Sequence, residues 1–306
     1  MNKITLGVLF GGVSSEHDIS TVSAKGILSA IDKEKYNLVL LGITKEGRWF
    51  LFDDDIDLLP EDRWLTSPSL VPAWISPDRS VHGVVTAKGD TIRLDAVFPV
   101  LHGKNGEDGT VQGLFELAGV PVINGLTDYA HPCQVLADLM TIRERRGTLA
   151  GLKLCFVGDG SNMANSLIVG GLLAGMQVSC VCPPGYRPAA DVLMFAHKYG
   201  NAFHLTTDPA EGLRDADIVA TAAWNTTGPG TAESEQRLRD FVGFQLTGRL
   251  LENAKPNALV LHCLPAHRGE EISTALFEQH ADEIFDEAEN RLHVQKAVLA
   301  VLLAGK

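Results

Sequence analysis

The sequence predicts an α/β protein with two three-layer domains and mostly parallel sheets, and two observations lead to this fold class. First, 306 residues are enough for two domains of ordinary size, and an apolar content of 45% is enough for two hydrophobic cores. Second, short apolar runs alternate with stretches of helical period in the second half of the chain. Such alternation is typical of a parallel sheet that helices cover on both faces. We therefore expect Rossmann-like domains.

Composition narrows the class of function. A net charge of −12 argues against binding to nucleic acid or another polyanion. No apolar run is long enough to cross a bilayer, and the start lacks the charged and then apolar pattern of a signal peptide. The five cysteines include no CxxC pair, so core thiols are the default interpretation. We expect a cytoplasmic enzyme with small-molecule substrates and without a cofactor, a metal ion, nucleic acid or a membrane partner.

The first half of the chain opens with a predicted strand at residues 4–10. Gly11-Gly12 then permits a tight turn, and Ser15 is expected to cap the helix that follows, with Asp18 in the capping-box position. Strand, turn and helix start together suit an anion or a small ligand. Further strands are expected at residues 37–44 and 96–101. The polar, proline-containing stretch between them, residues 46–90, is predicted to form loops and short irregular pieces.

The second half contains the alternating elements. Strands are predicted at residues 152–157, 177–182, 202–205, 218–222 and 258–263. Helical stretches lie between most of them, for example at residues 165–173 and 189–197, and a last helix runs to Leu303. Ligands of parallel sheets bind beyond the carboxyl ends of the strands. Three candidate site segments fall there, namely residues 158–162, 224–228 and 262–265.

The stretch at residues 119–134 joins the two halves. Residues 120–123 are predicted to form a short strand, Asn124-Gly125 a turn, and Pro132 the first turn of a helix. His131 and Gln134 are three residues apart, so they share one face at the start of this helix. The helix start suits an anionic ligand. An ordinary strand–loop–helix with a surface histidine is the alternative interpretation.

Two long motifs in the first half resemble the D-alanine–D-alanine ligases. They are residues 11–20, Gly-Gly-Val-Ser-Ser-Glu-His-Asp-Ile-Ser, and residues 102–113, which begin His-Gly-Lys-Asn-Gly-Glu-Asp-Gly. The resemblance implies a Rossmann-like domain over residues 1–121 that precedes an ATP-grasp module. It also implies that Glu16 contacts the ammonium of the first D-alanine and that His102 lies near the same substrate. Glu16 could instead be a carboxylate that the helix dipole favours. The ATP-grasp module is absent from this sequence, which argues against D-alanine ligation.

From about Val120 to the end, the chain resembles the ornithine carbamoyltransferases. The motifs are His-Pro-Cys-Gln at 131–134, Gly-Asp-Gly at 158–160, Asn-Ser at 165–166, His-Cys-Leu-Pro-Ala-His-Arg-Gly at 262–269 and Glu-Ala-Glu-Asn-Arg at 287–291. The resemblance implies that His131, Gln134 and Arg291 hold the carbamoyl group and the phosphate of carbamoyl phosphate. It also implies that Cys263 and the carbonyl of Leu264 face the attacking amine. Each residue has a simpler interpretation, because His131 could cap a helix, Cys263 could be a core thiol, and Arg291 could pair with Glu287.

The chain departs from that family at four places. The Ser-Thr-Arg-Thr-Arg phosphate loop is missing, and the amine loop after Gly-Asp-Gly keeps one asparagine, Asn162, in place of two. The aspartate of the family's Thr-Asp-x-Trp segment is Ala222. Its Ser-Met-Gly segment is Thr226-Thr227-Gly228. Packing residues are retained while contacts to the amine change, which indicates altered specificity, ablation or the joining of two parents.

The functional prediction is a carbamoyltransferase, intact or crippled, that acts on carbamoyl phosphate and on ornithine or a related amino acid. The alternative is a non-catalytic or engineered fusion that at most binds an amino acid. We place one domain at residues 1–121 and the second at 122–306, with the helix from His131 to Arg146 bridging them. The last helix is expected to pack back on the first domain. A homo-oligomer, for example a dimer through the ligase-like domain, is compatible with the sequence.

Overall fold

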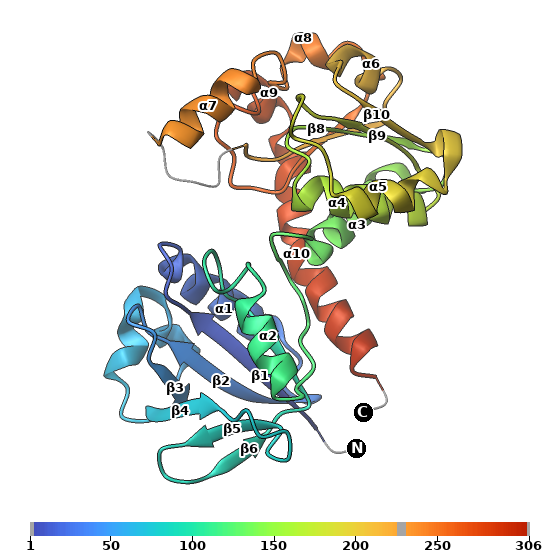
Figure 1. Ribbon diagram of the computed structural model, residues 1–306. Helices are drawn as coiled ribbons and strands as arrows, with labels where there is room; N and C mark the ends of the chain where they lie inside the picture. The colour runs from blue at the N-terminus through green and yellow to red at the C-terminus, as the bar shows by residue number, and fades with distance from the viewer. Residues whose placement is uncertain (1–2, 225–230, 305–306) are drawn as a thin grey trace. The chain divides into compact units, whose positions relative to one another are not determined.

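The computed structural model describes residues 3–224 and 231–304. The chain divides into two compact units (Figure 1). Unit 1 comprises Met1–Asp128 together with Gln295–Lys306, and unit 2 comprises Tyr129–Val294. Both units are layered α/β structures, so the predicted fold class is confirmed.

Unit 1 contains a seven-stranded sheet in the order β6-β5-β4-β3-β2-β1-β7. Its centre is parallel, with β1 (Ile4–Gly11) lying between β2 (Tyr36–Ile43) and β7 (Ala96–Pro99). These are the three strands that the sequence predicts for this half. Val122 adds a single parallel bridge beside Val97, so the short strand expected at residues 120–123 only extends the sheet edge.

Residues 46–90 are more regular than the sequence analysis expects. They hold three antiparallel strands, β3 (Trp49–Phe52), β4 (Val71–Ile75) and β5 (Gly83–Thr86), and β6 (Thr91–Arg93) completes the meander. Two short 3₁₀ segments, η1 (Ile56–Leu58) and η2 (Pro60–Thr66), separate β3 from β4. Strands of three to five residues carry too little periodicity to stand out among prolines and charges, and it is pairing with neighbours that stabilises them.

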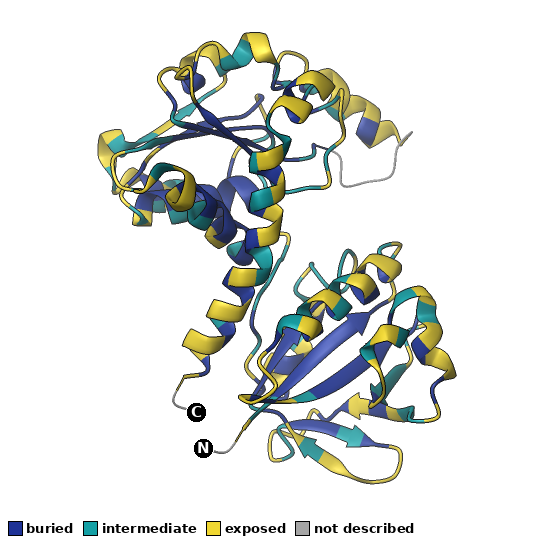
Figure 2. Cartoon of the chain, turned by 180° about the vertical axis from the view of Figure 1, so that it is seen from behind, coloured by how far each residue is buried: buried dark blue, intermediate teal, exposed yellow. Residues whose placement is uncertain are grey.

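Helices cover both faces of the unit 1 sheet. One face packs against α1 (His17–Ala30) through Ala24 and Leu28. The last turn of α10 (Ala281–Leu302) and the residues beyond it add Leu299 and Leu303 to this core. The other face packs against α2 (Thr110–Leu117). The central strands β1, β2 and β7 are largely buried, whereas the edge strand β6 and the outward helix faces are exposed (Figure 2).

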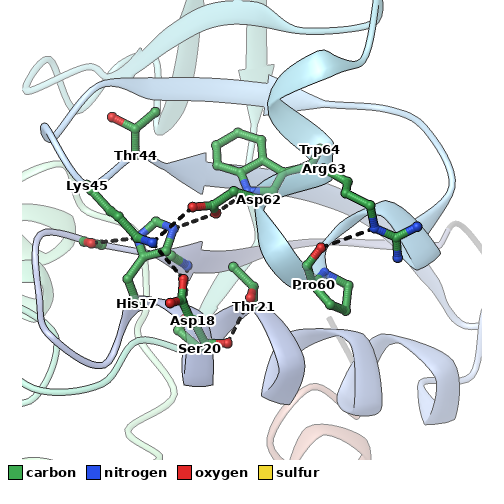
Figure 3. A network of polar contacts seen from close by, with 12 residues as sticks. His17, Asp18, Ser20, Thr21, Thr44, Lys45, Pro60, Asp62, Arg63 and Trp64 are labelled. Atoms are coloured by element: carbon green, nitrogen blue, oxygen red, sulfur yellow. Dashed lines mark hydrogen bonds and ion pairs between the residues drawn. The ribbon is translucent and has the colours of Figure 1, made fainter.

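A polar network fixes the turn between β1 and α1 (Figure 3). His17 is buried and places Nδ1 2.8 Å from the carbonyl oxygen of Gly12 and Nε2 2.8 Å from Asp62 Oδ1. Lys45 Nζ lies 2.8 Å from Asp18 and 3.3 Å from Asp62. The predicted cap is wrong, because Glu16 occupies the N-cap position and makes no side-chain capping bond. The network, rather than a serine cap, holds this helix start.

Unit 2 contains a five-stranded sheet in the order β10-β9-β8-β11-β12, and every pair in it is parallel. The strands are β8 (Lys153–Val157), β9 (Gln177–Val181), β10 (Phe203–Thr206), β11 (Ile218–Thr221) and β12 (Leu259–His262). All five lie within two residues of the predicted spans. Buried apolar runs of this length, separated by helices, are the sequence pattern that parallel strands require.

Helices again form two layers around the sheet of unit 2. One core includes side chains of α3 (Pro132–Arg146), α4 (Asn162–Leu173) and α5 (Ala190–His197). The opposite core includes side chains of α6 (Pro209–Leu213), α9 (Thr274–Gln279) and the first turn of α10. Shorter elements complete the unit, namely η3 (Gly200–Ala202), α7 (Ala232–Asp240) and α8 (Gly248–Leu251).

The units differ from the predicted boundaries at both ends. Residues 122–128 belong to unit 1, because Ile123 N–H donates to the carbonyl oxygen of Val97 and Asp128 N–H donates to that of Glu107. Residues 295–306 also belong to unit 1, since Leu299 and Leu303 are buried in its core. The helix with residues in both units is α10, whereas α3 lies wholly in unit 2.

Candidate functional site

The segment that enters α3 is held by α4. His131 occupies the N-cap position, and its main-chain N–H donates to Ser166 Oγ at 2.7 Å. Asn165 Nδ2 donates to the carbonyl oxygen of Tyr129 at 2.9 Å. The His131 side chain makes no capping bond to α3, so capping does not explain this histidine. Its ring is buried and is oriented by the fold toward the last helix.

His131, Gln134 and Arg291 lie together in unit 2. Arg291 Nη1 donates to Gln134 Oε1 at 2.7 Å and lies 3.4 Å from His131 Nε2. The residues come from α3 and α10, which are far apart in sequence. The buried Nε of Arg291 has no hydrogen-bond partner within residues 3–224 and 231–304. A buried guanidinium N–H without a partner is costly unless a ligand satisfies it.

Two buried carboxyl groups hold the Gln134 amide from the other side. Gln134 Nε2 donates to Asp138 Oδ1 at 2.8 Å and to Glu287 Oε1 at 2.7 Å. Burial raises the pKa of Asp138 to about 6 and raises the pKa of Glu287 well above its usual range, and the neighbouring carboxylate raises the latter further. Two carboxyl groups in contact away from water cannot both carry charge at low cost.

Glu287 also reaches the end of β12. Its Oε2 accepts the main-chain N–H of His262 at 2.8 Å. His262 in turn places Nε2 3.0 Å from Glu271 and accepts the N–H of Leu264 on Nδ1 at 3.0 Å. Leu264 has a φ of +47°, a backbone conformation that residues other than glycine rarely adopt. The buried His262 therefore fixes the turn that carries Cys263 and Leu264.

The electrostatics of the site favour a neutral thiol and a cationic guanidinium. Burial raises the pKa of the Cys263 thiol, and the charge of Glu287 raises it further. Such a thiol is a poor nucleophile, since the thiolate is the reactive form. Burial lowers the pKa of Arg291, and nearby thiols and carboxyl groups oppose that effect. An arginine stays charged in proteins, so it can bind an oxyanion here.

The remaining predicted residues of unit 2 lie at the carboxyl ends of β8 and β11. Asn162 begins α4 and is partly buried. Ala222 follows β11 and is buried. Asp159 forms an ion pair with Arg237 of α7, whose Nε also donates to the carbonyl oxygen of Trp224 at 2.8 Å. Thr226 lies outside the described residues.

Glu16 and His102 come together in unit 1. A Cβ at Gly103 would lie 2.5 Å from Glu16 Oε2, so the carboxylate packs directly on the loop beside His102. His102 places Nδ1 3.2 Å from Glu107 Oε1 and Nε2 3.3 Å from Ser23 Oγ. Both side chains are partly exposed. A pocket of about 400 Å³ borders His102 and is lined by Gly12, Trp49, Leu101, Lys104 and Leu114 among others.

Two groups of side chains have the composition of a metal site. They are His17, Asp18 and Asp62, and His267, Glu270 and Glu271, with potential ligand atoms within 4.8 Å of one another. In the first group Lys45 Nζ already contacts both aspartates, so a lysine supplies the positive charge. In the second, Glu271 is engaged with His262 and with the N–H of His267. Neither arrangement favours a metal ion.

Sequence reasoning missed Asp138 and Glu287 as parts of the site. Asp138 lies four residues after Gln134 on one helix face, and Glu287 lies four residues before Arg291. A carboxylate at that spacing on a helix is ordinarily a solvated charge. Only the packing of α3 against α10, which buries both side chains, gives these two residues a common partner in Gln134.

These features define the class of protein: a doubly wound α/β protein with a buried polar cluster at the carboxyl edge of a parallel sheet, the place where such sheets bind ligands. Residues 150–302 match the family model for the aspartate/ornithine carbamoyltransferase Asp/Orn binding domain, and residues 5–125 match that for the D-ala D-ala ligase N-terminus. The chain belongs to the aspartate/ornithine carbamoyltransferase family. Its first half carries a ligase-type N-terminal domain, so both resemblances are confirmed.

Individual relatives agree with this assignment. The chain is 48% identical over 197 residues to the ornithine carbamoyltransferase of Carboxydothermus hydrogenoformans, which covers 63% of each chain. It is 49% identical over 188 residues to that of Methanoculleus marisnigri, covering 61% of this chain and 60% of the relative. The solved ornithine carbamoyltransferase of Pyrococcus furiosus matches with a TM-score of 0.72 and 32% identity, covering 100% of this chain and 86% of that one.

The chain spans about three fifths of the length of these curated relatives. Within residues 3–224 and 231–304, no helix has the length and apolar character needed to cross a membrane.

Proposed function

We propose that this protein is a carbamoyltransferase that transfers the carbamoyl group of carbamoyl phosphate to the side-chain amine of ornithine or a related amino acid. The observation that carries the proposal is the cluster of Arg291, Gln134 and His131, in which a buried guanidinium keeps an N–H without a partner among the described residues. The names of the relatives specify ornithine as the amine.

The cluster supplies donors for an acyl phosphate, although the family's Ser-Thr-Arg-Thr-Arg phosphate loop is missing from this chain. Arg291 offers a fixed positive charge and several N–H groups to the phosphate and to the carbonyl oxygen. Gln134 Oε1 accepts from Arg291 and keeps a second lone pair for the amino group of the carbamoyl moiety. His131 lies beside Arg291, where a ring N–H would reach the same oxyanion.

The proposed reaction forms a C–N bond to the amine and breaks the C–O bond to phosphate. The neutral amine of the acceptor attacks the carbamoyl carbon, and a C–N bond forms while the carbonyl oxygen gains negative charge. That charge develops beside Arg291 and His131, where preorganised donors lower the barrier. The carbonyl then re-forms, the C–O bond to phosphate breaks, and phosphate leaves with the electron pair. The proton lost by the attacking nitrogen passes to the phosphate or to water.

The proposed site is altered on the amine side as well as on the phosphate side, which lacks the family's Ser-Thr-Arg-Thr-Arg loop. At the position where the family motif has an aspartate, Ala222 offers no carboxylate to an α-ammonium, and Asp159 is occupied by Arg237. Cys263 and Leu264 remain on a fixed turn, with the thiol neutral. We therefore expect a weakly held amine, and the acceptor is defined only as ornithine or a related amino acid.

The test is turnover of the full chain with carbamoyl phosphate and a panel of amines. The panel contains L-ornithine, L-lysine, L-aspartate and putrescine, and mass spectrometry detects each carbamoylated product together with released phosphate. His131→Ala serves as the site control. Product with one amine that falls at least 10²-fold in the control supports the proposal. Phosphate release without a carbamoylated amine, or equal rates in the control, would overturn it and leave a fusion that at most binds an amino acid.

A further inference from the structure

The Gln134 amide has a single orientation that satisfies its neighbours. A primary amide carries two N–H donors and one oxygen acceptor. Both donors are used, one on Asp138 Oδ1 at 2.8 Å and one on Glu287 Oε1 at 2.7 Å. The oxygen therefore points the other way and accepts from Arg291 Nη1 at 2.7 Å. In a flipped amide, donors would face the Arg291 guanidinium and an acceptor would face two carboxyl groups.

Burial makes this orientation strict. Gln134, Asp138 and Glu287 are each 1% exposed, so water cannot satisfy a misplaced group. The two carboxyl groups contact each other, and burial raises the pKa of both, so the pair retains a proton. One negative charge then remains to balance the positive charge of Arg291. The arrangement costs little only while all three side chains keep their roles.

We propose that Glu287, together with Asp138, is a positioning residue that orients Gln134 so that an acceptor, and not a donor, faces the acyl group of the bound phosphate compound. The proposal rests on the proposed function and deepens it. A carbamoyl group carries an NH₂ that donates to Gln134 Oε1, whereas an acetyl group of the same shape carries a methyl that cannot. The positioned oxygen thus selects a carbamoyl donor over an acetyl donor.

Glu287 makes a second contact that supports this role. Its Oε2 accepts the N–H of His262, which precedes Cys263 on the strand end facing the amine. One carboxyl group therefore connects α10 with α3 and with β12. Glu287 thereby links the proposed acyl side of the site with the strand end that carries Cys263.

The decisive variant is Glu287→Gln, which keeps the size of the side chain and replaces an acceptor oxygen by an NH₂. The Gln134 amide then has one acceptor fewer for its NH₂ group, so the orientation with its oxygen toward Arg291 is no longer favoured. The matched control is Asn290→Ala, three residues further along α10. Asn290 Nδ2 ties the same two helices together by donating to Thr141 Oγ1 at 2.9 Å and to Glu144 Oε2 at 2.8 Å, without touching Gln134.

The first readout is the ratio of dissociation constants for acetyl phosphate and carbamoyl phosphate, measured by calorimetry. We expect a ratio of about 10 to 100 in the wild type and in the control, because one buried hydrogen bond distinguishes the two compounds. In Glu287→Gln we expect the ratio to fall below about 3. A ratio that stays at the wild-type value in Glu287→Gln would overturn the proposal.

The second readout does not depend on turnover or on either compound. The side-chain NH₂ of Gln134, labelled with ¹⁵N, should exchange slowly with solvent in the wild type and in the control, and at least 10-fold faster in Glu287→Gln. Should Glu287→Gln fail to fold, Asp138→Asn replaces it in both measurements. Failure of every protein to bind carbamoyl phosphate would sink the proposed function, while the Gln134 exchange rates would still decide the positioning. Equal exchange rates in all variants would contradict it.

Discussion

The two units hold their candidate site residues in opposite ways. In unit 2, Gln134 and the carboxyl groups of Asp138 and Glu287 are buried, and every amide hydrogen has a fixed partner. In unit 1, Glu16 and His102 are partly exposed on loops, and the contacts of the His102 ring, at 3.2 and 3.3 Å, are longer. The buried network leaves almost no freedom in residue identity, whereas the open loop tolerates substitution. We therefore expect substitutions in the buried network of unit 2 to change activity more than substitutions of Glu16 or His102.

The contrast also bears on what was altered. In unit 2, Arg291 and Gln134 of the proposed carbamoyl phosphate cluster are hydrogen-bonded, whereas Ala222 stands where the family motif has an aspartate. In unit 1, Glu16 packs against the loop at Gly103. A retained buried network beside a changed contact is what a site shows when stability and activity place different demands on its residues.

The largest effect is expected at Arg291. Arg291→Leu should lower kcat/KM for carbamoyl transfer by about 10³-fold, because it removes the charge that stabilises the oxyanion. Arg291→Lys should recover part of this loss, since it keeps a charge but not the planar fork. Steady-state kinetics of the three proteins checks this. A wild-type rate in Arg291→Leu would mean that the buried cluster takes no part in the reaction.

The next largest expected effect is on the pH dependence of the unfolding free energy, and it arises from the buried carboxyl pair of unit 2. Burial raises the pKa of Asp138 to about 6, so its protonated form stabilises the fold at low pH and that contribution is lost as pH rises through about 6. Relative to Asp138→Asn, the wild type should lose about 2–3 kcal/mol of unfolding free energy between about pH 4 and pH 7. Urea unfolding of both proteins at the two pH values measures the difference. Parallel pH profiles would contradict the buried carboxyl pair.

A glycine-to-alanine substitution tests how Glu16 packs in unit 1. Gly103→Ala should destabilise the fold by about 2 kcal/mol, because φ is +66° and the new Cβ would lie 2.5 Å from both Glu16 Oε2 and Ser14 Oγ, so both side chains would have to shift. Gly109→Ala is the matched control, since Gly109 has a φ of +84° but no atom within 4 Å of an added Cβ. The control should therefore lose only about 1 kcal/mol. Thermal unfolding compares them, and equal losses would show that Glu16 does not pack on this loop.

The smallest expected effect is a gain. Ala222→Asp restores the carboxylate that the family motif has at this position, and it should lower KM for L-ornithine by about 10-fold, the value of one charge-assisted hydrogen bond. Ala222→Asn is the control that adds the same volume without a charge. Initial rates over a range of ornithine concentrations provide KM. An unchanged KM in a folded Ala222→Asp protein would place the α-ammonium elsewhere in the site.

Much of unit 2 could be predicted from its sequence, because buried parallel strands leave long apolar runs and its motifs lie at strand ends. The resemblance of its motifs to the ornithine carbamoyltransferases indicated His131, Gln134 and Arg291, and the structure brings them together. Glu287 was expected only as a possible partner of Arg291, yet it bonds to Gln134 and His262. That role depends on how α3 packs against α10, a long-range contact that spacing along one helix does not encode.

In unit 1 the sequence identified the three central strands but not the meander that continues the sheet. The strands from β3 to β6 are three to five residues long, and Pro72 stands inside β4, so local propensity argued for loops. Pairing with neighbours decides their structure instead. Similarly, serine is a common N-cap residue, which is why Ser15 was predicted to cap the helix. The buried contacts of His17 instead start the helix at His17, with Glu16 in the N-cap position.

The most direct test of the central claim is the binding of carbamoyl phosphate to the buried cluster of unit 2. Isothermal titration of the wild type and of Arg291→Leu with carbamoyl phosphate, at equal protein concentrations and low salt, measures it without requiring an amine. We expect saturable binding to the wild type and a loss of at least 10² in affinity in the variant, because the buried charge is removed. Equal affinities in the two proteins, or no binding to the wild type, would contradict the assignment of this cluster as a carbamoyl phosphate site.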